Sequence, residues 1–259
     1  MKENKYNNSH FFSQYSQMSR SVEGLKGAGE WHVLQKMLPD FAGKRVLDLG
    51  CGFGWHCAYA IEHGATRVTG IDISEKMLEE AQKRNSSPLI EYQCLAIEDF
   101  DFQPDSYDMV ISSLTFHYLE SFIDICRKIN HCLTLGGAFV FSVEHPIFTA
   151  YGNQDWYYNQ EGNPIHWPVD RYFTEGKRTA VFHSRNSIQQ LFVGLWLYQF
   201  AYLKSGLKEA IYIGSQCFVI FDHFFAQKDC RTFTFCKITI YRPRKKVRPQ
   251  SNEIQGIEK

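Results

Sequence analysis

Three glycines and two acids form the pattern in this sequence that could do chemistry. The run VLDLGCGFGWH, from Val46 to His56, is typical of a buried strand, a glycine-rich turn and the start of a helix. A second apolar strand, VTGID, ends in Asp72, about twenty residues beyond the glycines. A strand, a glycine turn, a helix and an acid at the tip of the next strand indicate a nucleotide-binding half of a doubly wound sheet.

The spacing of the glycines separates two kinds of ligand. A dinucleotide fingerprint, G-x-G-x-x-G, would place its third glycine where Trp55 stands. A nicotinamide-dependent oxidoreductase is therefore disfavoured. The pattern present is Gly50-x-Gly52-x-Gly54 preceded by Asp48, which resembles motif I of the class I S-adenosylmethionine (SAM)-dependent methyltransferases.

The resemblance extends over about residues 11–178 and is closest to the small-molecule, bacterial-type branch of the methyltransferase type 11 kind. It is carried by the strings FFSQYSQMSRSVEGLKGAGEW, VLDLGCGFGWH, GIDISEKML, SSLTFHYL, FSVEHP and WPVDRYF. It implies a Rossmann-like α/β fold with a doubly wound, mostly parallel sheet of seven strands. It also implies SAM as cofactor and S-adenosyl-L-homocysteine as product. Beyond about Thr179 the resemblance fades.

The resemblance further implies where the cofactor binds. Glycine leaves room for a ligand in the turn. The helix after the turn points its N–H groups at the carboxylate of the SAM amino-acid end. Asp72 can accept hydrogen bonds from both ribose hydroxyls of SAM. Many relatives have Asp where Ala96 falls, so Glu98, Asp99 or the backbone of Ile97 would contact the adenine. The implied cofactor-binding residues are Asp48, Gly50, Cys51, Gly52, Gly54, Asp72, Ile73, Met77, Ala96, Ile97, Glu98, Ser113, Leu114, Tyr15 and Arg20.

Three residues are candidates for acid–base chemistry at the methyl acceptor. His117 lies in the loop after the fourth strand, where a neutral imidazole could take a proton from an O–H or N–H nucleophile. The alternative is that it only shapes the pocket. Glu144 and His145 end the fifth strand and are the second candidates, with anchoring of the next segment as their alternative role.

Alternating strands and helices must position these residues. We expect strands at 45–50, 67–73, 89–96, 107–114 and 138–143, and helices at 22–38, 55–63, 75–84 and 122–135. Such alternation predicts a parallel sheet with right-handed crossovers. Residues 147–178 have no clear period and many aromatics, which favours a lid over a purely structural cap. Later we expect a helix at 186–206 and strands at 209–214 and 232–241.

We divide the chain accordingly. Residues 1–44 form an N-terminal arm and helix over the cofactor site, 45–145 the SAM-binding core, and 146–180 an aromatic-rich lid or substrate insertion. Residues 181–241 supply a divergent C-terminal helix and strands, and 242–259 a basic flexible tail. Divergence on the substrate side is one interpretation of this C-terminal part, and an altered reading frame or splice is the other.

Composition limits the partners of the chain. The formal net charge of its 259 residues is zero. From Val181 onward, however, twelve Lys and Arg stand against five Asp and Glu. A basic tail is usually a solvated surface, so we do not expect nucleic acid as a partner. The N-terminus lacks the apolar run of a signal peptide, and the longest apolar segment, 191–203, is too short to span a bilayer.

The eight cysteines show no C-x-x-C and no metal-ligand spacing. We therefore expect no metal site and a reduced, cytoplasmic chain. The sequence predicts an enzyme that moves a methyl group from SAM to a small-molecule acceptor by in-line displacement. The alternative is a catalytically inactive SAM-binding or interaction protein of the same fold. The sequence does not indicate the acceptor, the atom methylated or the oligomeric state.

Overall fold

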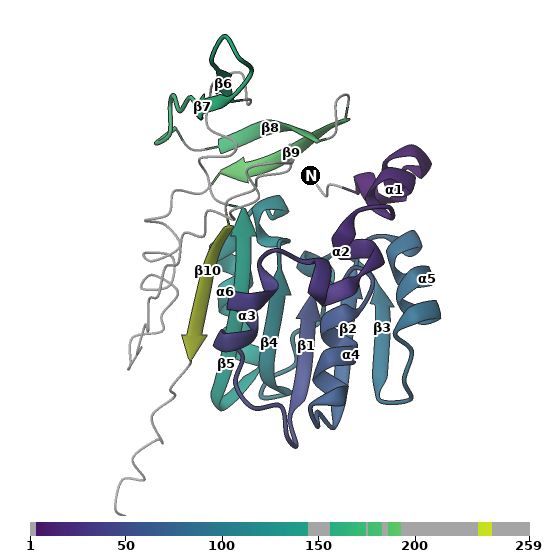
Figure 1. Ribbon diagram of the computed structural model, residues 1–259. Coiled ribbons are helices and arrows are strands. Elements are labelled where there is room, and N and C mark those ends of the chain that lie inside the picture. Colours follow the sequence, from purple (N-terminus) through teal and green to yellow (C-terminus); the bar gives the residue numbers. More distant parts are fainter. Residues whose placement is uncertain (1–3, 145–155, 175, 183–185, 193–232, 240–259) are drawn as a thin grey trace, which may run out of the picture.

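The computed structural model describes residues 4–144, 156–174, 176–182, 186–192 and 233–239. Its centre is a six-stranded sheet in the order β10-β5-β4-β1-β2-β3 (Figure 1). The strands are β1 Arg45–Leu49, β2 Arg67–Asp72, β3 Ile90–Cys94, β4 Tyr107–Ser113, β5 Leu133–Glu144 and β10 Phe233–Thr239. Strands β1 to β5 are parallel, and β10 pairs antiparallel with β5. The expected Rossmann-like, mostly parallel sheet is confirmed, and the described residues supply six strands of the seven expected.

Helices cover both faces of the sheet, because neighbouring residues of each strand point to opposite sides. On one face, Leu47 and Leu49 of β1 pack in one core cluster with residues of α6, Phe122–Cys132. On the other, Val46 packs with residues of α4, Trp55–Glu62, and α5, Glu75–Arg84. This two-sided burial explains why the strands are nearly continuous apolar runs in the sequence.

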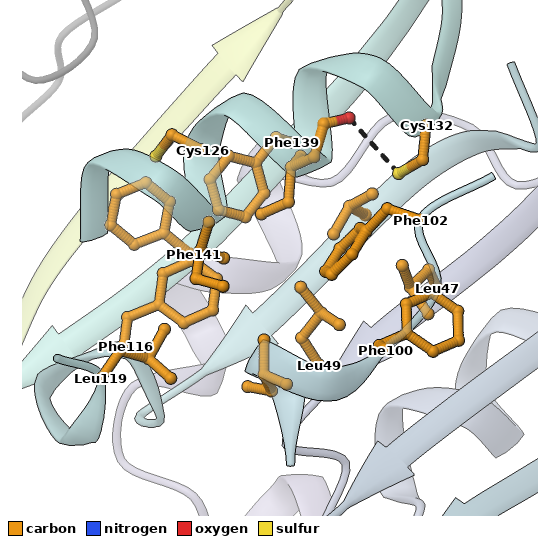
Figure 2. Close-up of a cluster of buried hydrophobic side chains, with 14 of the residues drawn as sticks. Leu47, Leu49, Phe100, Phe102, Phe116, Leu119, Cys126, Cys132, Phe139 and Phe141 are labelled. Atoms are coloured by element: carbon orange, nitrogen blue, oxygen red, sulfur yellow. Dashed lines mark hydrogen bonds between the residues drawn. The ribbon is translucent and has the colours of Figure 1, made fainter. Parts of the chain in front are cut away.

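The α6 side of the core is rich in aromatic side chains, shown in Figure 2. Phe139 and Phe141 on β5 stack with ring centroids 4.8 Å apart, and Phe116 packs against both. Each of these rings is buried, which contributes roughly 2–3 kcal/mol per side chain to the free energy of unfolding. The cluster supports the ends of β4 and β5, from which the site residues follow.

The first helices of the N-terminal arm lie at the carboxyl edge of the parallel strands, and its last helix packs on a face of the sheet against Val140 of β5 (Figure 1). It contains a 3₁₀ helix Lys5–Asn7, α1 Ser9–Tyr15, α2 Ser19–Val22, a 3₁₀ helix Gly24–Gly27 and α3 Trp31–Met37. The single helix expected at 22–38 is therefore wrong. Gly24 has a φ of 64°, and this left-handed residue separates α2 from the 3₁₀ helix that follows.

Three further expectations about elements need correction. Helix α6 ends at Cys132 and β5 begins at Leu133, because Leu133 already pairs with Tyr107 of β4. Asn186–Phe192 is not helical but is strand β9, paired antiparallel with β8 Gly176–Phe182. The stretch 147–178 contains regular structure, the short hairpin of β6 Tyr157–Tyr158 and β7 Pro164–His166.

Several other expectations fall on parts of the chain outside the described residues. These are His145, the strand at 209–214, the remainder of the helix at 186–206 and the tail at 242–259. Within the described residues, no helix is long and apolar enough to cross a membrane. The same residues contain no cluster of three or more side chains suited to a metal ion.

Candidate functional site

A cavity of about 130 Å³ opens at the carboxyl edge of β1, β2 and β4. It brings together most of the residues that the sequence predicted. Those that line it are Tyr15, Arg20, Gly50, Gly52, Asp72, Ile73, Met77, Ala96, Ile97, Glu98, Ser113, Leu114, His117 and Glu144. Asp48, Cys51 and Gly54 do not line it, and His145 lies outside the described residues.

The glycine turn after β1 shapes one wall of this cavity. Gly50 has a φ of 77°, and a Cβ added there would lie 2.2 Å from Oγ1 of Thr115. A Cβ at Gly54 would lie 2.1 Å from the hydroxyl of Tyr92. At Gly52, with φ of 54°, a Cβ would meet nothing within 4 Å. The sequence interpretation that all three glycines make room for a ligand therefore fits Gly52 alone, since the other two make room for protein side chains.

Asp72 ends β2 in a fixed orientation at the cavity. Its Oδ2 accepts from the N–H of Gly52 at 2.9 Å, and its Oδ1 accepts from the N–H of Ser74 at 2.9 Å. Burial raises the pKa of this carboxyl to about 6, although the backbone donors act in the opposite direction. Each carboxylate oxygen can accept a second hydrogen bond, so Asp72 can still bind a pair of hydroxyl groups.

Asp48 lies behind the turn rather than in the cavity. It is 1% exposed, and its Oδ2 accepts from the thiol of Cys57 at 3.3 Å. Burial raises its pKa to about 7, helped by the nearby charge of Asp72. Its Oδ1 accepts no hydrogen bond from the described residues. Asp48 therefore contacts α4 and lines neither this cavity nor its glycine wall.

A second, smaller cavity adjoins the first under the N-terminal arm. The two cavities share Tyr15, Arg20, Gly50, Gly52 and Ser113, and the second is also lined by Cys51, Trp55 and His56. Within the described residues, Nε1 of Trp55 and Oγ of Ser21 on its wall are buried without a hydrogen-bond partner. The first turn of α4, whose backbone N–H groups have no partner within the helix, also begins at this cavity.

The polar groups around this second cavity test whether the amino-acid end of SAM suits the site. The cationic guanidinium of Arg20, the unpaired N–H of Trp55, the Ser21 hydroxyl and the N-terminus of α4 together suit a carboxylate. Burial lowers the pKa of His56 to about 4, so its imidazole is neutral at pH 7. The donor set present thus fits SAM, with its sugar on the side of Asp72.

The other end of the main cavity is lined by side chains of the segment after β4. Leu114 has a φ of 55°, a strained conformation for a leucine that is held by its N–H donating to the carbonyl of Ser142 at 2.9 Å. His117 follows in the 3₁₀ helix Phe116–Tyr118 and is 5% exposed. The N–H of Glu144 donates to Nδ1 of His117 at 3.5 Å.

This hydrogen bond bears on the proposed role of His117. A neutral imidazole that accepts at Nδ1 carries its proton at Nε2. In that tautomer His117 can donate a hydrogen bond from Nε2 to a ligand, whereas taking up a ligand's proton at Nε2 would require a change of tautomer. Glu144 is 7% exposed and lines the same part of the cavity. The two candidates are therefore adjacent.

Some cavity residues had not been predicted. Thr115, Tyr118 and Leu119 belong to the SSLTFHYL string, whose inward-facing positions depend on the 3₁₀ turn. Tyr6 precedes the N-terminal string that carries the resemblance, and its ring packs edge-on against Tyr15 with centroids 5.1 Å apart. The aromatic residues clustered near the N-terminus were the only signal that could have found it.

Comparisons with known proteins agree with this geometry. A family model described as a methyltransferase domain matches residues 47–141. A candidate SAM-dependent methyltransferase from Listeria monocytogenes is 48% identical, with a TM-score of 0.72 over 83% of this chain and 99% of that one. A SAM-dependent methyltransferase from Mesorhizobium loti is 35% identical, with a TM-score of 0.71 over 83% of this chain and 100% of that one.

A more distant relative shares the core alone. A ubiquinone biosynthesis O-methyltransferase from Neisseria meningitidis is 35% identical over 107 residues, which cover 40% of this chain and 45% of that protein. The two solved structures are matched over nearly their whole length. The chain belongs to the class I SAM-dependent methyltransferases.

Proposed function

We propose that this methyltransferase acts on a small-molecule acceptor by in-line displacement. The observation that carries the proposal is the continuity of the main cavity, which runs from Gly52 and Asp72 to His117 and Glu144. One continuous cavity thus joins the residues suited to the cofactor and a second group of polar side chains. Its small size and its partial cover by the N-terminal arm favour a small acceptor.

The chain's contribution to the cofactor side is binding and orientation. Asp72 would accept from the ribose hydroxyls, Ile73 and Met77 would flank the adenine, and Arg20 with the start of α4 would bind the carboxylate. SAM supplies an electrophilic methyl group on a sulfonium when it is bound. We infer that Glu98 lies near the adenine edge, since Ala96 has no polar side chain to meet it.

On the acceptor side, the protein would align a nucleophile and exclude water. Correct alignment of two reacting groups can supply about 7–11 kcal/mol of the barrier reduction without any general base. His117 would donate from Nε2 and hold the acceptor, and Glu144 would take a proton where the nucleophile carries one. The tyrosines and Leu119 around them suit an acceptor with a flat or apolar body.

An oxygen nucleophile is the first class to examine, because the core relative from Neisseria meningitidis is an O-methyltransferase in ubiquinone biosynthesis. The inactive alternative has no support from the Listeria monocytogenes and Mesorhizobium loti structures, which are both described as methyltransferases.

The test combines cofactor binding with methyl transfer. We expect micromolar calorimetric binding of SAM and S-adenosylhomocysteine, weakened at least about tenfold, or 1.4 kcal/mol, in Asp72→Ala. Asp101→Ala, at an exposed acid away from the cavity, is the matched control and should bind as wild type. Labelled SAM is then offered with panels of hydroxyl, carboxyl, amine and thiol compounds. Transfer to a macromolecule and to none of the small compounds would refute the proposed acceptor class.

A further inference from the structure

Glu30 is a buried acid that the site as described so far does not use. It immediately precedes α3, and its side chain is 2% exposed. Its Oε1 forms an ion pair with Nη2 of Arg20 and also accepts from Oγ of Ser113 at 3.3 Å. Glu30 itself lines neither cavity.

The two partners of Glu30 lie at the junction of the two cavities. Arg20 and Ser113 are both among the few residues that line both cavities, so they lie where the main cavity meets the second one. Arg20 comes from the N-terminal arm and Ser113 from the end of β4. Glu30 therefore fixes the polar side chains of this junction from behind, and joins two parts of the chain that are distant in sequence.

Further contacts tie this group to the sheet. Oγ of Ser113 lies 3.1 Å from Oγ of Ser142, which in turn accepts from the N–H of Leu114 at 3.2 Å. A displacement of Glu30 would therefore shift the ends of β4 and β5 as well as the arm. The group as a whole sets the spacing between the arm and the strands.

The charges of the pair support a positioning role. Burial alone would raise the pKa of Glu30, but the nearby Arg20 outweighs it and the pKa is lowered. The pKa of Arg20 is raised, since attraction to Glu30 outweighs its own burial. Both groups are therefore ionised. A buried ion pair is weak evidence for stability, since apolar residues of similar volume often serve as well.

We propose that Glu30 is a positioning residue for the cofactor: by holding Arg20 and Ser113 at the junction of the two cavities, it aims the Arg20 guanidinium at the carboxylate of SAM. A guanidinium has five N–H donors in a fixed plane, and Glu30 engages Nη2. Donors therefore remain for a second carboxylate. This inference rests on the assignment of the cofactor's amino-acid end to Arg20 in the proposed function.

Two ligands separate this role from a structural one. S-adenosylhomocysteine carries the amino-acid end, whereas methylthioadenosine has the same adenosine and thioether but no carboxylate. In Glu30→Gln, which keeps the shape and removes the charge, we expect the Kd for S-adenosylhomocysteine to rise at least about tenfold. The Kd for methylthioadenosine should change less than about twofold. Calorimetry on the full chain measures both.

The control removes a more exposed ion pair at the amino ends of β1 and β4. Asp108→Asn breaks the pair with Arg45, whose Nε lies 3.1 Å from Oδ2 of Asp108, and neither residue lines a cavity. It should leave the ratio of the two Kd values as in wild type, whatever its effect on stability.

Arg20→Met and the double variant Arg20→Met/Glu30→Gln complete a double-mutant cycle with wild type and Glu30→Gln. If Glu30 acts through Arg20, the double variant should bind S-adenosylhomocysteine no more weakly than Arg20→Met. The double variant leaves no unpaired buried charge, so it keeps the test valid if Glu30→Gln alone fails to fold.

Three results would overturn the inference. They are equal losses for both ligands in Glu30→Gln, unchanged binding of S-adenosylhomocysteine, and a further loss in the double variant. If S-adenosylhomocysteine fails to bind folded wild type, the cofactor assignment of the proposed function falls with it. If Arg20→Met binds as wild type, only the assignment of the carboxylate to Arg20 and the inference fall.

Discussion

The two ends of the main cavity are built by different means. At the end suited to the cofactor, the main chain forms and orients most of the site. Gly50 and Gly52 have left-handed backbone, and Asp72 is fixed by N–H groups of Gly52 and Ser74. At the end suited to the acceptor, the wall consists of side chains on a short 3₁₀ helix and on β5.

This difference has a consequence for tolerance to change. A backbone-built site fails when the turn cannot form, so few residue types are allowed there. A wall of side chains such as Tyr118 and Leu119 can be altered one residue at a time while the sheet stays intact. The arrangement suits a fold that keeps one cofactor and varies its acceptor, since function resides in sites carried by a common fold.

The largest effect that we expect lies under the turn, at Asp48. Burial raises its pKa to about 7, above the value near 3.8 for an ordinary Asp. The folded protein therefore retains a proton that the unfolded chain loses. Its contribution to the unfolding free energy is complete below about pH 4 and is lost as the pH rises through about 7. Relative to wild type, Asp48→Asn should gain about 4 kcal/mol between these pH values, measured by urea unfolding.

Asp108 provides the control with the opposite sign. Burial disfavours its charged form, but hydrogen bonds from Arg45 outweigh this and lower its pKa. Its contribution is present above about pH 4 and is lost as the pH falls. Asp108→Asn should therefore lose stability relative to wild type at neutral pH. Parallel stability–pH curves for wild type and Asp48→Asn would contradict the account of Asp48.

The next effect separates two glycines of the same turn. Gly50→Ala must accept both a left-handed alanine and a contact with Thr115, so we expect a loss of about 3 kcal/mol in unfolding free energy. Gly52→Ala meets no protein atom and should lose about 1 kcal/mol. Its Cβ instead enters the cavity, so its Kd for S-adenosylhomocysteine should rise at least about tenfold.

Gly43→Ala is matched to Gly52→Ala, since Gly43 has a φ of 73° and open space around its Cβ but lies outside the cavity. It should show the same small loss of stability and unchanged ligand binding. If all three variants bound S-adenosylhomocysteine with equal affinity, the glycines would not differ in their effect on the cavity. That result would contradict the account that the main chain builds this end of the cavity.

The sequence predicted most residues that line this end of the cavity, because their signals are local. The central strands β1, β2 and β4 are largely apolar and covered on both faces, and Ser74 caps α5 by accepting from the N–H of Met77 as expected. The positions of Gly52 and Asp72 follow from chain connectivity alone, because the tips of adjacent parallel strands must meet.

The sequence failed where tertiary pairing overrides local preference. Residues 186–192 have apolar spacing compatible with a helix, yet they form β9 because β8 offers a hairpin partner. Leu133 likewise leaves α6 to pair with Tyr107 of β4. Glu30 lies in the string FFSQYSQMSRSVEGLKGAGEW but was not singled out, since its ion pair with Arg20 depends on how the arm folds back over the sheet.

We expect the smallest effect from a substitution at the acceptor end of the cavity. It tests most directly whether the two ends of the cavity are independent. His117→Gln keeps a hydrogen-bond acceptor near the N–H of Glu144 but cannot hold a proton as imidazole does. We expect the Kd for S-adenosylhomocysteine to change less than about twofold, and kcat with an identified acceptor to fall by about tenfold or less. Asp72→Ala should behave in the opposite way, with its main effect on cofactor affinity. A large loss of cofactor binding in His117→Gln would mean that the two ends are one coupled unit, because a side chain of the acceptor wall would then be setting the shape of the backbone turn.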